Sequence, residues 1–214
     1  MSTLTKPMVT WSGSSDPASP LVLLLHGRGS NEAEISSLVA HLAVGPAYAA
    51  VRAPIGEEGG YAWFANRGVG RPVAESLEET MLWFRTWLDS VTDRQRPVIL
   101  VGFSGGAAFA GALLLQEPER FKGAAILYGT LPFDAGVPTT PGRLKDANVF
   151  VAQGDDDTVI PRELLDRTWE YITGESGAHT MTVRHSGGHG IGQDALVQLV
   201  RWLEDLATSR DETP

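Results

Sequence analysis

Hydrophobic residues along the chain form two kinds of pattern: short unbroken apolar runs, and stretches in which they recur every three or four positions. The runs are typical of strands buried on both faces of a sheet, and the recurrences are typical of amphipathic helices. The predicted strands cover residues 8–11, 21–26, 47–53, 98–101, 124–128, 149–152 and 180–184. The predicted helices cover residues 32–41, 77–91, 107–115, 161–172 and 191–206.

Strands that alternate with helices predict an α/β fold with a mainly parallel central sheet and helices on both faces. We expect a single domain over residues 1–214, with a ragged start over about 1–7 and a frayed tail over about 209–214. Residues 55–72 and 129–145 are predicted to be long irregular loops. Loops of that length in a compact domain are usually functional.

One stretch places a serine between a predicted strand and a predicted helix. Val98-Ile-Leu-Val101 passes through Gly102-Phe-Ser-Gly-Gly106 into an apolar, Ala-rich helix. This is the context of the G-x-S-x-G nucleophile elbow, where a serine on a strained backbone needs neighbours without side chains. The alternative is a Gly-rich turn with an incidental serine. The flanking strand and helix favour Ser104 as a nucleophile.

A nucleophilic serine needs a base that takes its proton, and five histidines are available. His189 lies in a Gly-rich loop between the last predicted strand and the last predicted helix, so it can present its ring freely. His185 is the main rival, but we expect it at the end of the strand. His26 lies beside the glycines of the first loop. The other two, His41 and His179, are interpreted as surface or packing residues.

A carboxylate must orient the base, and three adjacent candidates follow the strand at 149–152. Asp157 directly precedes the segment Thr-Val-Ile-Pro161 and lies deepest in the loop, so it is the predicted acid. Three adjacent carboxylates also suggest calcium, but the spaced oxygen ligands and glycine of a calcium loop are missing. A solvated acidic turn is the simpler interpretation of Asp155 and Asp156.

The segment His26-Gly-Arg-Gly29 ends the strand at 21–26 and resembles a His-Gly loop that contributes one backbone N–H to an oxyanion hole. Its natural partner is the N–H of Gly105, directly after the serine. We therefore predict an oxyanion hole formed by the N–H groups of Arg28 and Gly105. The Arg28 side chain could meet an anionic substrate group or be solvated, and both readings stay open.

Charge and composition exclude several other classes of function. A formal net charge of -9 argues against a nucleic-acid groove and against binding to anionic membranes. The chain has no cysteine, so thiolate catalysis, disulfides and Cys-ligated zinc are excluded. The start of the chain carries no signal pattern, and its apolar run over 21–25 is too short to span a membrane. We expect a cytoplasmic protein without integral membrane association.

With these motifs in order, the chain resembles an α/β-hydrolase. More narrowly, it resembles the small, nearly capless carboxylesterase/phospholipase family that includes the acyl-protein thioesterases. The matching segments are Leu24-Leu-His-Gly-Arg-Gly29, Tyr61-Ala-Trp-Phe64, Gly102-Phe-Ser104 and Gly188-His189. The resemblance implies a cofactor-free, metal-free enzyme for carboxylic ester or thioester bonds. It also implies that Ser104, Asp157 and His189 are the catalytic triad.

The same resemblance implies that Trp63 and Phe64 line the acyl or alcohol pocket, and we place His26 and Gly27 beside the substrate. The family often has Gln directly after the nucleophile, where this chain has Gly105. The amide donor is kept, but a side chain that would help to shape the site is missing. This departure favours an esterase for small or medium acyl or aryl esters over a thioesterase for lipidated proteins.

The sequence therefore predicts a serine carboxylesterase that forms an acyl-enzyme on Ser104 with a small-molecule ester. A thioesterase or lysophospholipase with the same triad is the first alternative. A catalytically inactive hydrolase fold that binds a small ligand is the second, because fold alone does not determine function. An exposed sheet edge or the last helix could support a homodimer.

Overall fold

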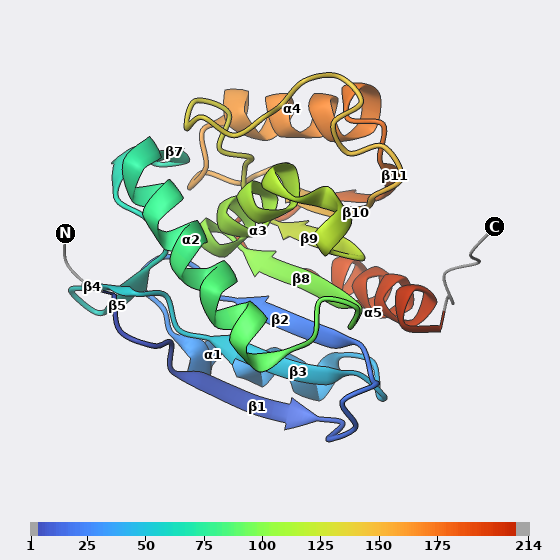
Figure 1. Cartoon of the computed structure of the whole chain (residues 1–214). Helices are drawn as coiled ribbons and strands as arrows, with labels where there is room; N and C mark the ends of the chain where they lie inside the picture. The colour runs from blue at the N-terminus through green and yellow to red at the C-terminus, as the bar shows by residue number, and fades with distance from the viewer. Residues whose placement is uncertain (1–3, 209–214) are drawn as a thin grey trace.

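Seven strands form one sheet within residues 4–208, which are the residues that the computed structural model describes. The sheet order is β1-β3-β2-β8-β9-β10-β11, with β1 antiparallel at one edge and every other neighbouring pair parallel (Figure 1). The strands are β1 (Val9–Gly13), β2 (Leu21–Leu25), β3 (Ala47–Val51), β8 (Val98–Phe103), β9 (Gly123–Leu127), β10 (Asn148–Gly154) and β11 (His179–His185). The predicted tail 209–214, and residues 1–3 of the predicted ragged start, lie outside the described residues.

Helices cover both faces of the sheet, as the alternation of elements predicts. Helices α2 and α3 lie on one face, and α1 and α5 lie on the other (Figure 1). The helices are α1 (Glu32–Ser36), α2 (Ala74–Val91), α3 (Gly105–Gln116), α4 (Arg162–Glu170) and α5 (Gln193–Thr208). No helix in the described part of the chain is long and apolar enough to cross a membrane.

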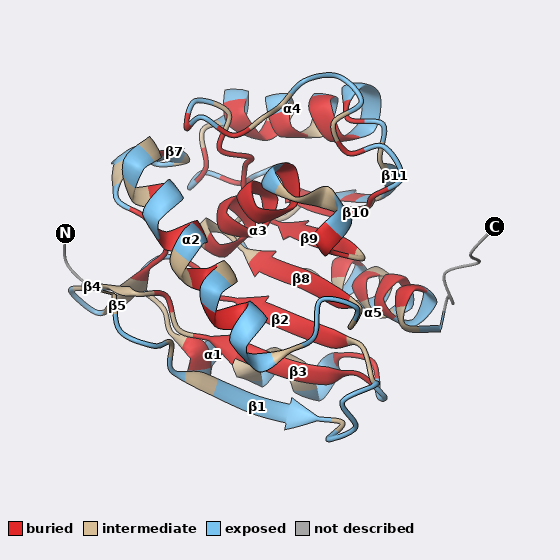
Figure 2. Cartoon of the chain, viewed as in Figure 1, coloured by how far each residue is buried: buried red, intermediate tan, exposed pale blue. Residues whose placement is uncertain are grey.

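The central strands are apolar at every position because both of their faces are covered. Leu21, Leu23 and Leu25 of β2 join the core beneath α2 and α3. The alternate residues Val22 and Leu24 join the core on the side of α5. Successive side chains of a strand point to opposite faces, so an unbroken apolar run fills two cores at once. Figure 2 shows the result: the central strands are buried throughout, whereas β1 is mostly exposed.

Residues 55–72 are more regular than the sequence predicts. They form two short antiparallel hairpins rather than one irregular loop. Gly59, with a φ of 89°, and Gly70, with a φ of 71°, lie in the two turns and take backbone conformations that side chains disfavour. The strands are β4 (Ile55–Glu57), β5 (Gly60–Ala62), β6 (Asn66–Gly68) and β7 (Arg71–Pro72). The glycines that suggested an irregular loop are the residues that close the hairpins.

Two predicted helices change their form near their ends. The helix predicted over 32–41 is the short α1 followed by a 3-10 helix, with the Asn31 side chain capping α1 by accepting from the Glu34 N–H at 3.0 Å. Pro161, predicted as the first helical residue, has an extended ψ of 129° and lies directly before α4. Beyond α4 the chain continues as a π-helix, Tyr171–Glu175. The residues between β9 and β10 that were predicted as a loop, 129–145, contain neither strand nor helix.

The serine turn brings β8, α3 and β2 into backbone contact. A Cβ atom on Gly102 would lie 2.2 Å from the carbonyl oxygen of Gly106. One on Gly106 would lie 2.1 Å from the carbonyl oxygen of Leu25. Both distances are far inside van der Waals contact, so the first and last glycines of the motif are needed for the close approach of strand and helix.

Gly102→Ala should lower the free energy of unfolding by about 3 kcal/mol or leave the protein insoluble, because the added methyl group meets backbone that cannot give way. Gly56→Ala is the matched control, since a Cβ there meets nothing within 4 Å. Its effect should stay within about 0.5 kcal/mol. Urea denaturation measures both variants. Equal stability of the two would contradict this account of the turn.

Candidate active site

Ser104 stands on a strained turn between β8 and α3. Its φ of 54° and ψ of -114° are rare for a residue with a side chain. Its backbone N–H donates to the carbonyl of Leu127 in the neighbouring strand β9 at 2.8 Å, which holds the turn against the sheet. The strained conformation is the one that a nucleophile elbow uses to expose a serine hydroxyl at the carboxyl end of the sheet.

His189 connects Ser104 to Asp157 by two hydrogen bonds. Its Nε2 lies 2.9 Å from Ser104 Oγ, and its Nδ1 lies 2.8 Å from Asp157 Oδ2. An ionised carboxylate only accepts, so the Nδ1 atom must carry the ring proton. The Nε2 atom is therefore free to accept the proton of the serine hydroxyl. The three side chains come from the segments after β8, β10 and β11, whose carboxyl ends meet at one edge of the sheet.

The Asp157 side chain is completely buried. Burial by itself raises the pKa of this carboxyl, but hydrogen bonds from His189 and from the N–H groups of Ile160 and Val159 outweigh it and lower the pKa below its usual value. Asp157 is therefore ionised at neutral pH. Asp155 and Asp156, the competing candidates, are exposed.

His185, the rival base, points to a different partner. It is the last residue of β11, as predicted, and its Nε2 lies 2.5 Å from the hydroxyl of Tyr128 rather than beside Ser104. His41 and His179 are exposed, in keeping with a surface position.

The two predicted oxyanion-hole residues, Arg28 and Gly105, lie next to each other beside the serine. A Cβ on Gly105 would lie only 3.2 Å from the Arg28 nitrogen, so the two loops are adjacent. Arg28 and Gly105 both line the same cavity as Ser104. Among the described residues, neither N–H donates to a protein acceptor. Two neighbouring N–H groups without a protein acceptor are available to hold an oxygen that gains negative charge.

The β4–β5 hairpin supports the Arg28 loop through its backbone. The Gly29 N–H donates to the Tyr61 carbonyl at 2.9 Å, and the Tyr61 N–H donates to the Ser30 carbonyl at 3.0 Å. The Arg28 guanidinium also donates to the Phe64 carbonyl at 3.0 Å and forms an ion pair with Glu57. The Arg28 side chain therefore has protein partners on this hairpin and the segment after it.

The prediction that His26 touches substrate is wrong. His26 is completely buried and does not line the cavity. Its Nδ1 donates to the Gly27 carbonyl at 2.7 Å, and its Nε2 accepts from the Ala53 N–H at 3.0 Å. Burial lowers the pKa of the ring below its usual value, in agreement with a neutral tautomer. His26 shapes the loop from within, whereas Gly27 does line the cavity.

The prediction that Trp63 lines the pocket is also wrong. Trp63 is 1 % exposed and stacks on Phe109 at 4.6 Å in the core. Its Nε1 donates to the His26 carbonyl at 2.8 Å. Phe64 lines the cavity instead. The two neighbouring rings, which lie in the bend after β5, therefore face different surroundings, the core and the cavity.

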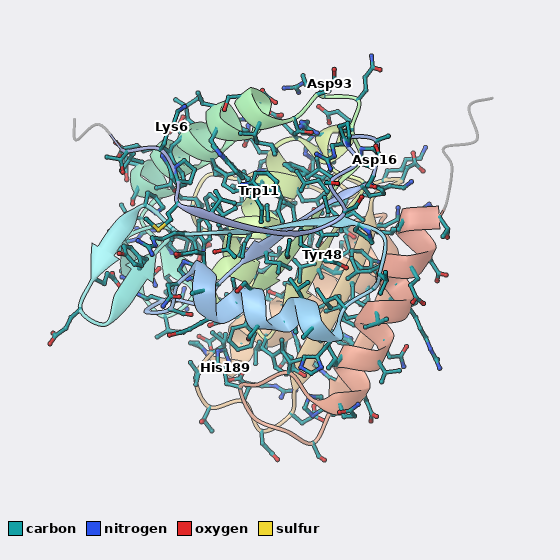
Figure 3. The ribbon with its side chains drawn as sticks, turned by 90° about the horizontal axis from the view of Figure 1, so that it is seen from below. Lys6, Trp11, Asp16, Tyr48, Asp93 and His189 are labelled. Atoms are coloured by element: carbon teal, nitrogen blue, oxygen red, sulfur yellow. The ribbon has the colours of Figure 1, made fainter. Side chains whose placement is uncertain are left out.

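A mainly apolar cavity of about 510 Å³ opens beside Ser104 and His189. The apolar residues that line it include Ile35, Phe64, Val69, Phe103, Val159 and Ile160. Val69, Val159 and Ile160 were missed by the sequence reasoning. The signal for the last two was available, because they directly follow the predicted acid. Figure 3 shows His189 among the loops beyond the sheet, on the side where α1 lies.

Comparison with known proteins identifies the family and the fold of the chain. A model of the phospholipase/carboxylesterase family matches residues 9–206. The chain belongs to the phospholipase/carboxylesterase family. The α/β-hydrolase fold expected from the sequence is thereby confirmed. The resemblance to this family that the sequence motifs indicated is confirmed as well.

Proteins similar to this chain differ in the activities that their names state. A putative hydrolase, MhqD, of Bacillus subtilis (strain 168) is 26% identical over 196 residues, covering 86% of this chain and 92% of MhqD. Acyl-protein thioesterase 1 of Kluyveromyces lactis is 29% identical over 167 residues, covering 69% of this chain and 73% of the thioesterase. The crystal structure of the Bacillus cereus carboxylesterase superposes with a TM-score of 0.81 at 22% identity, covering 94% of each chain.

The buried, neutral His26 should make the folded protein sensitive to acid. Its pKa is lowered from the ordinary value of 6.5, so below about pH 6.5 the unfolded chain takes up a proton before the folded chain does. The free energy of unfolding should therefore fall as the pH drops below 6.5. His26→Asn should be less stable at pH above 6.5 but show a shallower fall below it. Parallel stability curves for the two proteins would contradict this role.

Proposed function

We propose that the protein is a serine carboxylesterase that hydrolyses small to medium acyl or aryl esters. The observation that carries the proposal is the pair of hydrogen bonds, 2.9 and 2.8 Å long, that joins Ser104 to Asp157 through His189. In a serine–histidine–aspartate arrangement of this kind, the serine hydroxyl becomes a nucleophile when its proton moves to the imidazole. Membership of a hydrolase family supports the same conclusion.

In the proposed reaction, Ser104 Oγ attacks the ester carbonyl while its proton passes to His189 Nε2. Asp157 stabilises the imidazolium that forms, and the N–H groups of Arg28 and Gly105 hold the oxyanion. Each such donor contributes about 3 kcal/mol to transition-state binding. The tetrahedral intermediate then expels the alcohol, which takes the proton from His189. Water hydrolyses the acyl-enzyme by the same steps, with His189 as base again.

The size and character of the cavity support the substrate class. A volume of about 510 Å³ lies in the range of pockets for small ligands. Phe64, Ile160 and Val69 give it apolar walls, which suit a short acyl chain or an aryl group. An additional apolar hollow of about 380 Å³ shares Ile35 and Phe103 with it, so both sides of an ester have apolar surface available.

A thioesterase activity is the second candidate, and one observation favours it. Acyl-protein thioesterase 1 of Kluyveromyces lactis is 29% identical over 167 residues. The chemistry would be unchanged, because the same three side chains and the same N–H groups would act on a thioester carbonyl.

The cytoplasmic location, the absence of a nucleic-acid partner and the homodimer stay predictions from the sequence.

A fluorophosphonate probe should form a single adduct on Ser104, because such probes react with a serine that a neighbouring base activates. Ser104→Ala should abolish the adduct and lower ester hydrolysis by a factor on the order of 10⁴ or more, with the fold intact. His189→Ala should suppress labelling as strongly. Intact-protein mass, peptide mapping and circular dichroism measure these outcomes.

Ester hydrolysis at the wild-type rate by Ser104→Ala would refute the assignment. A folded wild-type protein that binds small esters but gives no adduct would favour the non-catalytic alternative instead. Ser14→Ala is a suitable control, because Ser14 lies in the turn after β1 and, in the described part of the chain, its side chain bonds Ser19 and the Asp16 N–H. Its labelling and turnover should match the wild type.

A panel of aryl esters from acetate to palmitate should separate the substrate classes. We expect the highest kcat/KM for short and medium acyl chains, and a decline once the chain outgrows the cavity. Thioesters of matched chain length, measured beside the oxygen esters, decide between the two activities. A maximum at palmitate, or thioesters preferred throughout, would contradict the esterase proposal in favour of the thioesterase or lysophospholipase.

A further inference from the structure

Tyr128 has an unusual backbone conformation directly behind the candidate active site. It follows β9, is completely buried, and has a φ of 50°. Bulky residues rarely adopt this left-handed conformation, because it crowds the side chain against the backbone. The Tyr128 N–H donates to the Ala152 carbonyl of β10 at 2.9 Å, so the strained residue is held in register with the sheet.

The Tyr128 hydroxyl bonds to both ends of the loop that carries His189. It accepts from the Gly192 N–H at 3.1 Å, so its own proton is available to His185 Nε2 at 2.5 Å. His185 ends β11, and Gly192 lies directly before α5, so these two residues delimit the loop. Burial raises the pKa of the Tyr128 hydroxyl, against a smaller opposing effect of the Gly192 N–H, and keeps it protonated as a donor.

The loop is packed closely around the His185 ring. A Cβ on Gly187 would lie 2.3 Å from that ring, and one on Gly192 would lie 3.0 Å from it. In addition, the Asp155 N–H donates to the His185 carbonyl at 2.8 Å, and the Asp156 N–H donates to the Gly187 carbonyl at 3.0 Å. The loop is thus held both by the acidic turn and by Tyr128.

We propose that Tyr128 is a positioning residue that, with His185 as its acceptor, clamps both ends of the 186–191 loop and so fixes the His189 ring between Ser104 and Asp157. This inference rests on the proposed function. Tyr128 does not line the cavity, so it acts through the loop and not on the substrate. Phe103 lies between the two residues. Its ring centroid is 6.1 Å from that of Tyr128 and 5.2 Å from that of His189.

Tyr128→Phe removes the hydroxyl and keeps the ring, which makes it the direct test. We expect kcat and the rate of fluorophosphonate labelling of Ser104 to fall about tenfold, because small misplacements of a catalytic group are costly. KM should stay within about twofold, because no substrate contact is lost. Amide hydrogen exchange in residues 186–192 should become faster.

Tyr48→Phe is the matched control. Tyr48 is also buried, and its hydroxyl donates to the Ala43 carbonyl at 2.5 Å. It lies on β3, well apart from His189 in Figure 3. This variant should lose a similar amount of thermal stability while its kcat, labelling rate and loop exchange stay at wild-type values. An equal loss of kcat in both variants would show a general effect of stability and overturn the proposal.

His185→Phe gives a second, independent variant, since it keeps a ring in the loop and removes the acceptor. It should reproduce the fall in kcat, and the double variant with Tyr128→Phe should cost little more than either single change. Full additivity would contradict a shared clamp.

The wild-type protein separates the two proposals. If its Ser104 is not labelled and it hydrolyses no ester, the proposed function fails and the positioning role fails with it. If the wild type is labelled, but Tyr128→Phe has wild-type kcat and unchanged exchange in residues 186–192, the clamp alone is wrong.

Discussion

The backbone of Ser104 is the constraint on which the rest of the site depends. Ser104, at the end of β8, has a positive φ. The turn that holds it brings α3 so close to the sheet that residues 102 and 106 have no room for a side chain. The flanking strands hold this turn, since the Ser104 N–H bonds to β9 and the Gly106 backbone lies against β2. Strain at one residue is thus balanced by close packing of the elements around it.

The other groups reach Ser104 because parallel strands end at the same edge of the sheet. Asp157 follows β10 and His189 follows β11, so two strand ends bring a carboxylate and an imidazole to the serine. The loops that carry them are joined by backbone hydrogen bonds rather than by covalent links. A site built from three loops needs such supports, because each added freedom of the His189 ring weakens its hydrogen bonds to Ser104 and Asp157.

Much of the fold could be predicted from the sequence, because burial on two faces leaves a strong pattern. The apolar run predicts a central strand over 21–26, and β2 covers Leu21–Leu25, one residue shorter. Secondary structure was harder to predict where glycine is frequent. Gly59 and Gly70 suggested an irregular loop, but they lie in the turns of two hairpins. Glycine marks a change of chain direction, and only pairing with another segment decides whether that change is a tight turn or an open loop.

By itself, the sequence determined the order of Ser104, Asp157 and His189 along the chain, the strand–turn–helix context of Ser104 and the fold class. Only the tertiary structure decided where the neighbouring side chains point. His26 and Trp63 belong to segments that border the site, yet their rings face the core, while Phe64 faces the cavity. His185 lies four positions before His189 and bonds to Tyr128 instead of to the serine. Spacing along a chain limits which residues can approach one another, but the direction of a side chain follows from the elements packed around it.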